Sequence, residues 1–207
     1  KKTNFLFVDA GANYGYWSVL VSSKEFNQKK VIALEPLKSN FNFLKKNQSY
    51  NKNRFKIFNI GVGERKKKTK IFFNDRTSNV GASILNDRKK KFSEAIKIDK
   101  IDSILLKRKE KNFVLKLDVE GNEINALIGS KKILKKNCLI IYEDHGNDNL
   151  HLNSKYLWKK KYSLYFSDGK SISKINKLDE LNDIKRIKHK GYNFIATKSS
   201  LFKKKLI

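Results

Sequence analysis

The chain has 207 residues, 39% of them hydrophobic, which is enough to bury one sizeable core and fits a single domain over residues 1–207. Its longest apolar runs fall far short of the roughly 18 residues that cross a membrane, so no transmembrane segment is expected. The single cysteine, Cys138, excludes an internal disulfide framework and fits a reducing compartment such as the cytoplasm.

The formal net charge of +27 makes nucleic acid a candidate partner, because a basic surface attracts phosphate groups whatever the base sequence. Only six of the 47 basic residues are arginine, however. The lysine runs, such as Lys66–Lys68 and Lys159–Lys161, are scattered along the chain and lack interleaved aromatic residues. The composition therefore favours a solvated surface, and a basic RNA-binding or RNA-modifying protein is kept as the alternative function.

The first predicted element is the stretch Phe5–Ser18, FLFVDAGANYGYWS, in which an apolar run leads into a glycine-containing turn. Phe5–Val8 predicts a strand buried on both faces in a parallel sheet, and a helix is expected to begin near Trp17. Because glycine has no Cβ, Gly11 and Gly15 allow a tight turn and a close approach of the backbone to a ligand. The free N–H groups at the start of the following helix suit polar ligand groups.

This turn differs from the dinucleotide fingerprint G-x-G-x-x-G, since Asn13 lies between the glycines and Asp9 precedes them. A carboxylate in that place repels a pyrophosphate but attracts an ammonium group, such as the one on S-adenosylmethionine. The second predicted strand, Val31–Glu35 (VIALE), also ends in an acid, 24 positions after Gly11. An acid there accepts hydrogen bonds from both ribose hydroxyls. Together the two acids predict an adenosine ligand that carries no phosphate.

The alternation of strands and helices continues along the chain. Ser39–Asn47 predicts a helix and Arg54–Asn59 a third strand, which together indicate a parallel sheet with right-handed crossovers. The stretch from Ile60 to Ile98 is irregular. We expect a short strand at Lys70–Phe73 and a loop at Ser78–Leu85, which is a candidate flap over the ligand.

The second half of the chain repeats the pattern and ends in further strands. The expected elements are a helix at Asp99–Lys109, a strand at Phe113–Leu117, a helix at Glu123–Leu134, a strand at Leu139–Tyr142, a helix near Leu150–Lys161 and strands at Ser163–Phe166 and Tyr192–Thr197. In open α/β sheets, ligands bind at the carboxyl edge of the parallel strands. Residues that directly follow these strands are therefore the candidate site residues.

Acids follow two of these strands directly. Asp118 and Glu120 lie two apart after the fourth strand, and Glu143 and His145 repeat that spacing after the fifth. Methyl transfer from a sulfonium mainly requires a positioned acceptor and the removal of one proton, which favours a hydroxyl acceptor with His145 or Asp118 as general base. A less favoured variant is metal-assisted, with Asp118, Glu143 and Asp144 holding Mg²⁺.

Three stretches together resemble the FkbM-type family of S-adenosylmethionine-dependent methyltransferases: FVDAGANYGYWS (Phe7–Ser18), ALEP (Ala33–Pro36) and KLDVEGNEINALIG (Lys116–Gly129). The likeness extends over nearly the whole chain through FNIGVGE (Phe58–Glu64), IYEDHG (Ile141–Gly146) and YNFIATK (Tyr192–Lys198). The segment D-V-E-G-x-E is its most family-specific part.

This resemblance implies an α/β, Rossmann-like class I methyltransferase fold with a mostly parallel seven-stranded sheet of order 3-2-1-4-5-7-6, flanked by helices. It implies O-methylation of a sugar, glycan or small natural product. The chain starts at Lys1 and contains no methionine, so helices before the first strand are expected to be missing.

The resemblance also implies a role for each matching position in the site. The methionine end of the cofactor would be lined by Asp9, Gly11, Asn13 and Gly15, and the ribose would be held by Glu35. The adenine would lie near Asn59, Gly61 and Val62, and the reacting methyl group would lie near Asp118 and Glu120.

Overall fold

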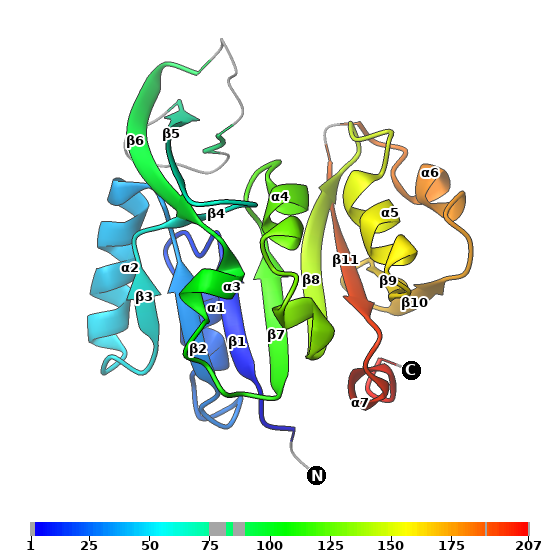
Figure 1. The fold of residues 1–207 in the computed structure, drawn as a ribbon, viewed down its shortest axis with the longest axis horizontal. Coiled ribbons are helices and arrows are strands. Elements are labelled where there is room, and N and C mark those ends of the chain that lie inside the picture. The colour runs from blue at the N-terminus through cyan, green and yellow to red at the C-terminus, as the bar shows by residue number, and fades with distance from the viewer. Residues whose placement is uncertain (1–2, 75–81, 85–89, 189, 207) are drawn as a thin grey trace.

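The computed structural model describes residues 3–74, 82–84, 90–188 and 190–206, in which strands and helices alternate as expected (Figure 1). The elements are β1 (Leu6–Ala10), α1 (Tyr16–Val21), β2 (Lys30–Leu34), α2 (Lys38–Tyr50), β3 (Lys56–Phe58), β4 (Gly61–Val62), β5 (Lys67–Phe73), β6 (Phe92–Asp99), α3 (Ile101–Ile104), β7 (Asn112–Leu117), α4 (Glu123–Ile128), a 3₁₀ turn (Ile133–Lys135), β8 (Asn137–His145), α5 (Leu152–Lys159), β9 (Ser163–Ser167), β10 (Ile172–Ile175), α6 (Glu180–Ile184), β11 (Gly191–Thr197) and α7 (Ser200–Lys203).

Within the described ranges, the main sheet has eight strands in the order β10-β9-β11-β8-β7-β1-β2-β3. The neighbouring strands β3, β2, β1, β7 and β8 are parallel, whereas β11, β9 and β10 pair antiparallel. The sheet has the expected order 3-2-1-4-5-7-6 from β3 to β9, when β7, β8, β9 and β11 are counted as strands 4, 5, 6 and 7. The expected count of seven was wrong, because β10 adds an edge strand. Only Ile175 of β10 is buried, and the sequence of this strand, ISKI, does not alternate apolar and polar residues in the way that predicts a strand.

A second sheet, with the order β4-β6-β5, forms in the stretch that looked irregular in the sequence. Figure 1 shows it above the carboxyl ends of β1 and β2. A separate small core forms where its buried residues pack against Leu37, which precedes α2; the sheet residues are Ile71, Phe73, Ile96 and Ile98. The expected short strand at Lys70–Phe73 is therefore the end of a longer strand. Of the expected flap at Ser78–Leu85, residues 78–81 and 85 lie outside the described ranges.

Two expected helices are shorter than their sequence patterns indicated. Asp99–Lys109 yields only α3, and Glu123–Leu134 breaks after α4 into the 3₁₀ turn. The break occurs at Gly129, where an added Cβ would overlap the carbonyl oxygen of Gly63. Strand β8 is longer than expected, because β11 pairs with it as far as His145. Glu143 and His145 therefore lie on a strand and not on the loop after it.

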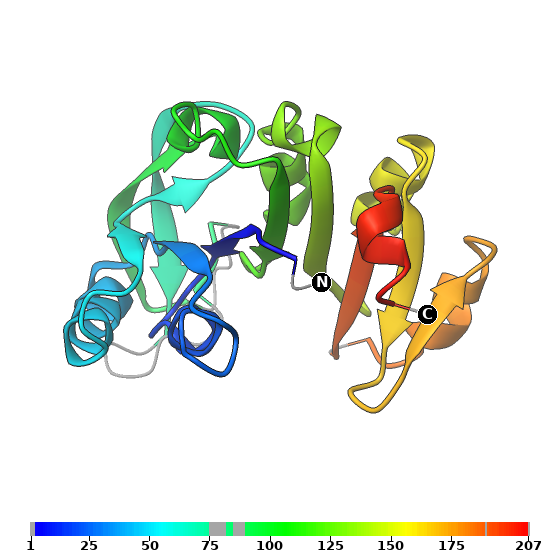
Figure 2. The same cartoon turned by 90° about the horizontal axis from the view of Figure 1, so that it is seen from below.

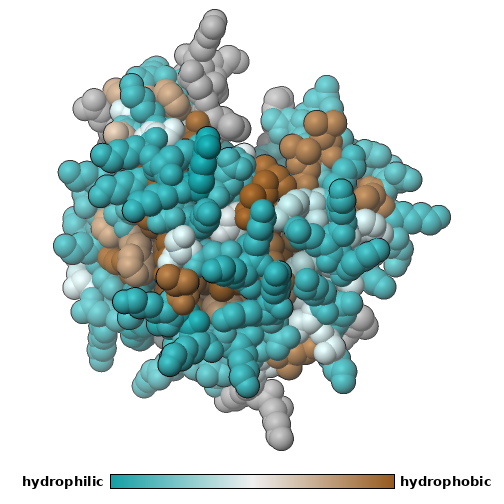
Figure 3. All heavy atoms as spheres, in the orientation of Figure 1, coloured by the Kyte–Doolittle hydropathy of each residue, from teal (hydrophilic) through white to brown (hydrophobic). Residues whose placement is uncertain are grey.

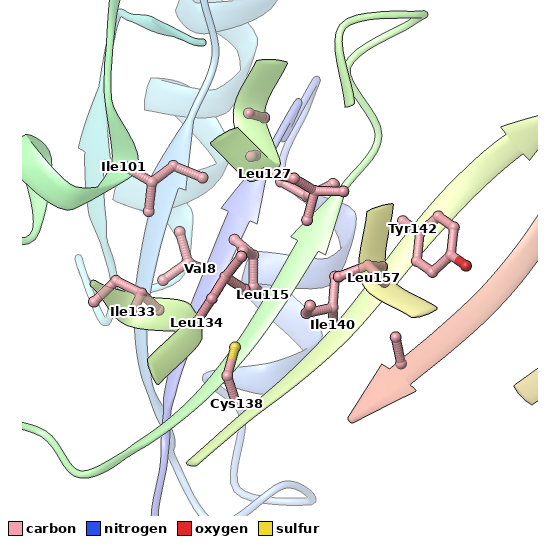
Figure 4. Packing of buried hydrophobic residues seen from close by; sticks show 14 of the residues in the cluster. Val8, Ile101, Leu115, Leu127, Ile133, Leu134, Cys138, Ile140, Tyr142 and Leu157 are labelled. Carbon is pink, nitrogen blue, oxygen red and sulfur yellow. The ribbon is translucent and has the colours of Figure 1, made fainter. Parts of the chain in front are cut away.

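Helices cover both faces of the main sheet, with α3, α4 and α5 on one side and α1 and α2 on the other (Figure 2). The first core lies between the main sheet and the helices α3, α4 and α5. Figure 4 shows it, with Val8, Leu115 and Ile140 from three neighbouring strands packed near Leu127 and Leu134. Apolar residues on both faces of β1 and β7 explain why these strands read as continuous apolar runs. Hydrophilic side chains cover most of the face drawn in Figure 3.

In the part of the chain that the structure describes, no helix has the length and apolar character needed to cross a membrane. Cys138 is buried at the start of β8 in the first core. Burial raises the pKa of its thiol to about 12, so the side chain packs as a small apolar residue.

A buried ion pair holds the end of β8. Lys185 Nζ lies 3.1 Å from Asp144 Oδ1, and each side chain is only 1% exposed. Lys185 also donates a hydrogen bond to the carbonyl oxygen of Asp148 and lies 3.1 Å from His151 Nδ1. Burial raises the pKa of Asp144, and the Lys185 ammonium group opposes that shift. The pair fixes the strand that carries Glu143 on its opposite face.

Lys185→Met is expected to lower the free energy of unfolding by roughly 3 kcal/mol, because it leaves the Asp144 carboxylate buried without its partner. The measurement is urea unfolding followed by circular dichroism. The matched control is Lys177→Met at an exposed position, for which a change within about 0.5 kcal/mol is expected. Equal stability of the two variants would contradict the assigned role of the ion pair.

Candidate active site

A pocket opens at the carboxyl edge of β1, β2 and β7, beneath the small sheet. One part of its wall is polar and comes from strand ends and loops, and the other part is apolar. The polar residues include Asn13, Glu35, Asp118, Glu120 and Asn122, and the apolar ones include Ile60, Val62, Ile71, Ile96 and Ile98. A site with one apolar side and a few convergent polar groups is typical of small-molecule binding.

The turn between β1 and α1 forms one end of this pocket and contains three left-handed residues. Gly11 has φ 76°, Asn13 has φ 51° and Gly15 has φ 88°. An added Cβ on Gly11 would overlap the carbonyl oxygen of Asp118, so glycine allows the ends of β1 and β7 to meet. Gly15 does not line the pocket, and its Cα faces Leu44 of α2. Gly15 therefore allows the turn to pack against α2, and its expected contact with the methionine end of the cofactor stays a prediction.

Glu35 follows β2 and lies in the wall of the pocket, with only 5% of its surface exposed. Its carboxylate accepts the backbone N–H of Asn13 at 2.8 Å and that of Leu37 at 2.9 Å. Burial raises the pKa of Glu35 to about 7, although the two N–H donors act in the opposite direction. This carboxylate links the turn after β1 to the end of β2.

Asn13 supplies a second acceptor in the same wall. Its side-chain oxygen is buried, and within the described ranges it has no hydrogen-bond partner. A buried polar atom without a partner is costly, so a ligand donor at this position would be favoured. Asn13 and Glu35 together suit a ligand with hydroxyl or ammonium donors, and the ribose and amino-acid end of S-adenosylmethionine have such donors.

The apolar side of the pocket lies where the adenine was expected. Gly61 and Val62 both line it, and Ile98 of β6 packs beside Gly61. Asn59 does not line the pocket, because its side-chain N–H₂ group donates to the carbonyl oxygens of Glu35 and Pro36, both at 2.9 Å. Asn59 therefore positions the turn after β2.

Asp9 lies behind the pocket wall and has no exposed surface. Its carboxylate accepts a hydrogen bond from Ser18 Oγ at 2.7 Å and pairs with Lys116 Nζ at 3.4 Å. In this structure its contacts are therefore with the protein's own side chains. Sequence reasoning did not single out Lys116 or Ser18. The available signal was a lysine inside the apolar run of β7.

The loop after β7 brings Asp118 and Glu120 to the pocket, as the sequence predicted that they would lie together. The loop is held by Glu123, whose buried carboxylate accepts the backbone N–H groups of Val119 and Gly121. Two further residues that sequence reasoning missed are Asn122, which donates to the carbonyl oxygen of Val62 at 2.7 Å, and Asn40, which lines the pocket.

Glu143 lines a groove that adjoins the pocket and shares Asp118 with it, whereas His145 lies beside Glu143 and lines neither. Glu143 Oε2 and His145 Nε2 are 3.7 Å apart. Burial raises the pKa of Glu143 to about 7, the Asp118 carboxylate adds to that shift, and His145 opposes it. Glu143 therefore changes its charge near neutral pH. Gly191 makes room for it, because an added Cβ there would overlap Glu143 Oε1.

The three acids of the metal-assisted variant do not come together. Asp144 points to the opposite face of β8 from Glu143 and pairs with Lys185. The described residues contain no group of three or more His, Cys, Asp and Glu side chains arranged to hold a metal ion.

The fold and this pocket define a Rossmann-like methyltransferase domain. Residues 9–164 match the methyltransferase FkbM domain family, so the chain belongs to that family. A comparison with curated protein sequences found no match.

Solved structures share the fold. The FkbM methyltransferase of Methylobacillus flagellatus KT is 15% identical with a TM-score of 0.61, covering 93% of this chain and 43% of that one. A precorrin-6y methyltransferase from Geobacter metallireducens GS-15 is 12% identical with a TM-score of 0.54, covering 95% and 80%. The B. subtilis tRNA methyltransferase TrmK is 11% identical with a TM-score of 0.51, covering 96% and 62%. The chain thus spans less than half the length of the FkbM structure.

Gly11→Ala is expected to destabilise the fold and weaken binding of S-adenosylhomocysteine, because the added Cβ would meet the backbone of Asp118, directly after β7. The matched control is Gly169→Ala, which has φ 89° and nothing within 4 Å of the added Cβ. The control isolates the left-handed strain, about 1 kcal/mol. Thermal unfolding and calorimetric titration measure both effects. Similar losses in the two variants would show that the contact between β1 and β7 is unimportant.

The pKa of Glu35 predicts that ligand affinity depends on pH. Hydroxyl donors bind the ionised carboxylate, so affinity for S-adenosylhomocysteine should rise by on the order of tenfold between pH 6 and pH 8. Glu35→Gln should bind more weakly and lose this rise, whereas Glu64→Gln, at an exposed position, should behave as the wild type. The measurement is calorimetric titration at several pH values. An unchanged pH profile in Glu35→Gln would contradict the assignment.

Proposed function

We propose that the chain is an S-adenosylmethionine-dependent methyltransferase that methylates a hydroxyl group of a sugar, glycan or small natural product. The observation that carries this proposal is the pocket formed by Gly11, Asn13 and Glu35 in a domain of the FkbM methyltransferase family. Because the chain covers only part of the related FkbM structure, the activity is a property to be tested on this chain.

The residues present fit the cofactor. Glu35 offers acceptor positions for the ribose hydroxyls, and Asn13 offers a buried oxygen for a further donor. Val62 and Ile98 form an apolar slot suited to the adenine. When bound, S-adenosylmethionine supplies a methyl group on a sulfonium, which is already activated for in-line displacement.

The chain's own contribution is to position the acceptor and remove its proton. We assign the proton transfer to Glu143, which lines the groove beside Asp118 and whose raised pKa of about 7 keeps part of the population ionised at neutral pH. The Asp118 carboxylate raises that pKa, which makes Glu143 a stronger base than an ordinary glutamate. His145 stands beside Glu143, and its charged form would stabilise the ionised carboxylate.

RNA is the second candidate acceptor, and the net charge of +27 favours it. The shared fold with a tRNA methyltransferase is compatible with that alternative but is not evidence for it at 11% identity. The two candidates differ in where the methyl group goes, so one labelling experiment separates them.

The purified chain would be incubated with methyl-labelled S-adenosylmethionine and cell extracts divided into glycan, lipid, RNA and small-metabolite pools. We expect label in the glycan or small-metabolite pool. Ribonuclease-sensitive label would instead support RNA as acceptor. Wild-type protein without affinity for S-adenosylhomocysteine would refute the proposed cofactor and with it the function.

Glu143→Gln is expected to lower the methyl-transfer rate by roughly 10²–10⁴-fold, because it removes the proton acceptor. The wild-type rate should rise as pH increases through about 7, as the raised pKa of Glu143 is crossed and the carboxylate ionises. The variant should lose that rise. Asp179→Asn, at an exposed acid that precedes α6, is the control and should keep both rate and profile. A variant that keeps the wild-type profile would exclude Glu143 as the base.

A further inference from the structure

Lys116 places an ammonium group inside the carboxyl edge of the sheet. Its Nζ lies 3.4 Å from Asp9 Oδ1 and 3.2 Å from Asp118 Oδ2, and it donates to the carbonyl oxygen of Gly11 at 3.4 Å. Its side chain is 11% exposed and lines the groove that adjoins the pocket. Lys116 therefore bridges the ends of β1 and β7 at the place where the pocket and the groove meet.

The two carboxylates that contact Lys116 differ in their exposure to solvent. Asp9 has no exposed surface, and one ammonium group balances its charge. The side chain of Asp118 is 41% exposed and lines both the pocket and the groove. Burial alone would lower the pKa of Lys116, but the carboxylates of Asp9 and Asp118 outweigh burial and raise it. Lys116 is therefore charged at neutral pH, and Asp118 is the acid that a ligand can reach.

The amino-acid end of the proposed cofactor carries an ammonium and a carboxylate group on one carbon atom. Lys116 and Asp118 present the complementary pair of charges, with 3.2 Å between Nζ and Oδ2. The pair lies next to Gly11, whose carbonyl oxygen accepts a hydrogen bond from Lys116 Nζ at 3.4 Å. A zwitterion that lies across this pair would meet an opposite charge at each of its groups.

We propose that Lys116 and Asp118 bind the zwitterionic amino-acid end of the cofactor, with Lys116 contacting its carboxylate and Asp118 its ammonium group. Asp9 is then a positioning residue that acts through Lys116, and its own contact with the ligand is not required. This inference rests on the proposed function, because it assumes that S-adenosylmethionine and its product occupy the pocket.

The test compares two ligands that share the nucleoside. S-Adenosylhomocysteine has the amino-acid end, and methylthioadenosine lacks it. Lys116→Met should weaken binding of S-adenosylhomocysteine by roughly tenfold or more and leave methylthioadenosine unchanged, since a hydrogen bond to a charged group is lost for only one ligand. Calorimetric titration measures both affinities. Lys56→Met, at an exposed position on β3, is the matched control and should leave both unchanged.

A second variant separates ligand binding from folding, because Lys116→Met leaves Asp9 buried without its counter-ion. The double variant Asp9→Asn/Lys116→Met removes both charges and should recover stability, but it should still bind S-adenosylhomocysteine selectively more weakly. Equal affinities of the double variant and the wild type for both ligands would overturn the inference, because Lys116 would then serve only Asp9. Equal losses for both ligands would also overturn it. Wild-type protein that binds neither ligand would refute the proposed function itself.

Discussion

The pocket depends on the contact between the ends of β1 and β7 at Gly11. No residue with a Cβ fits there without moving the backbone at Asp118, so the two strand ends approach as closely as a peptide backbone allows. That approach brings the turn after β1 against the loop that carries Asp118 and Glu120. It also places Lys116 within reach of both strand ends, where its charge offsets the repulsion between Asp9 and Asp118. The polar wall of the pocket is the result.

Burial raises the pKa of two carboxyl groups at this site. The carboxyls of Glu35 and Glu143 are both removed from water, and both have a pKa of about 7. Glu35 is compensated by two backbone N–H donors, which also fix its position. Glu143 has no such support and faces other acids, so its carboxyl exchanges protons near neutral pH. Similar pKa values thus arise from different surroundings, because backbone donors hold Glu35 whereas Glu143 faces other acids.

The sequence predicted the parallel core well, because β1, β2, β7 and β8 are apolar runs buried on both faces. It predicted neither β10 nor the full small sheet. The strand β5, KKTKIFF, is exposed over most of its first half, so its lysines hide the strand signal. The strand β10 lies at the sheet edge with one buried residue.

The acids at the strand ends were also predictable, since a carboxylate after an apolar run is visible in the sequence. Their partners were not. Lys116 contacts Asp9 more than one hundred positions away, and only the pairing of β1 with β7 brings them together. The same reason explains Glu123, which was predicted only to begin a helix and which also holds the loop after β7. Contacts of this kind follow from register, which a single sequence does not determine.

Gly191 connects the C-terminal strands to the position of the Glu143 side chain. It lies on β11, an antiparallel neighbour of β8, and the space above it is filled by the end of the Glu143 side chain. Because that side chain is flexible, a methyl group at position 191 would leave the sheet intact and displace only the carboxyl group. A substitution at position 191 would therefore change the position and the acidity of the Glu143 carboxyl group while leaving Glu143 itself unaltered.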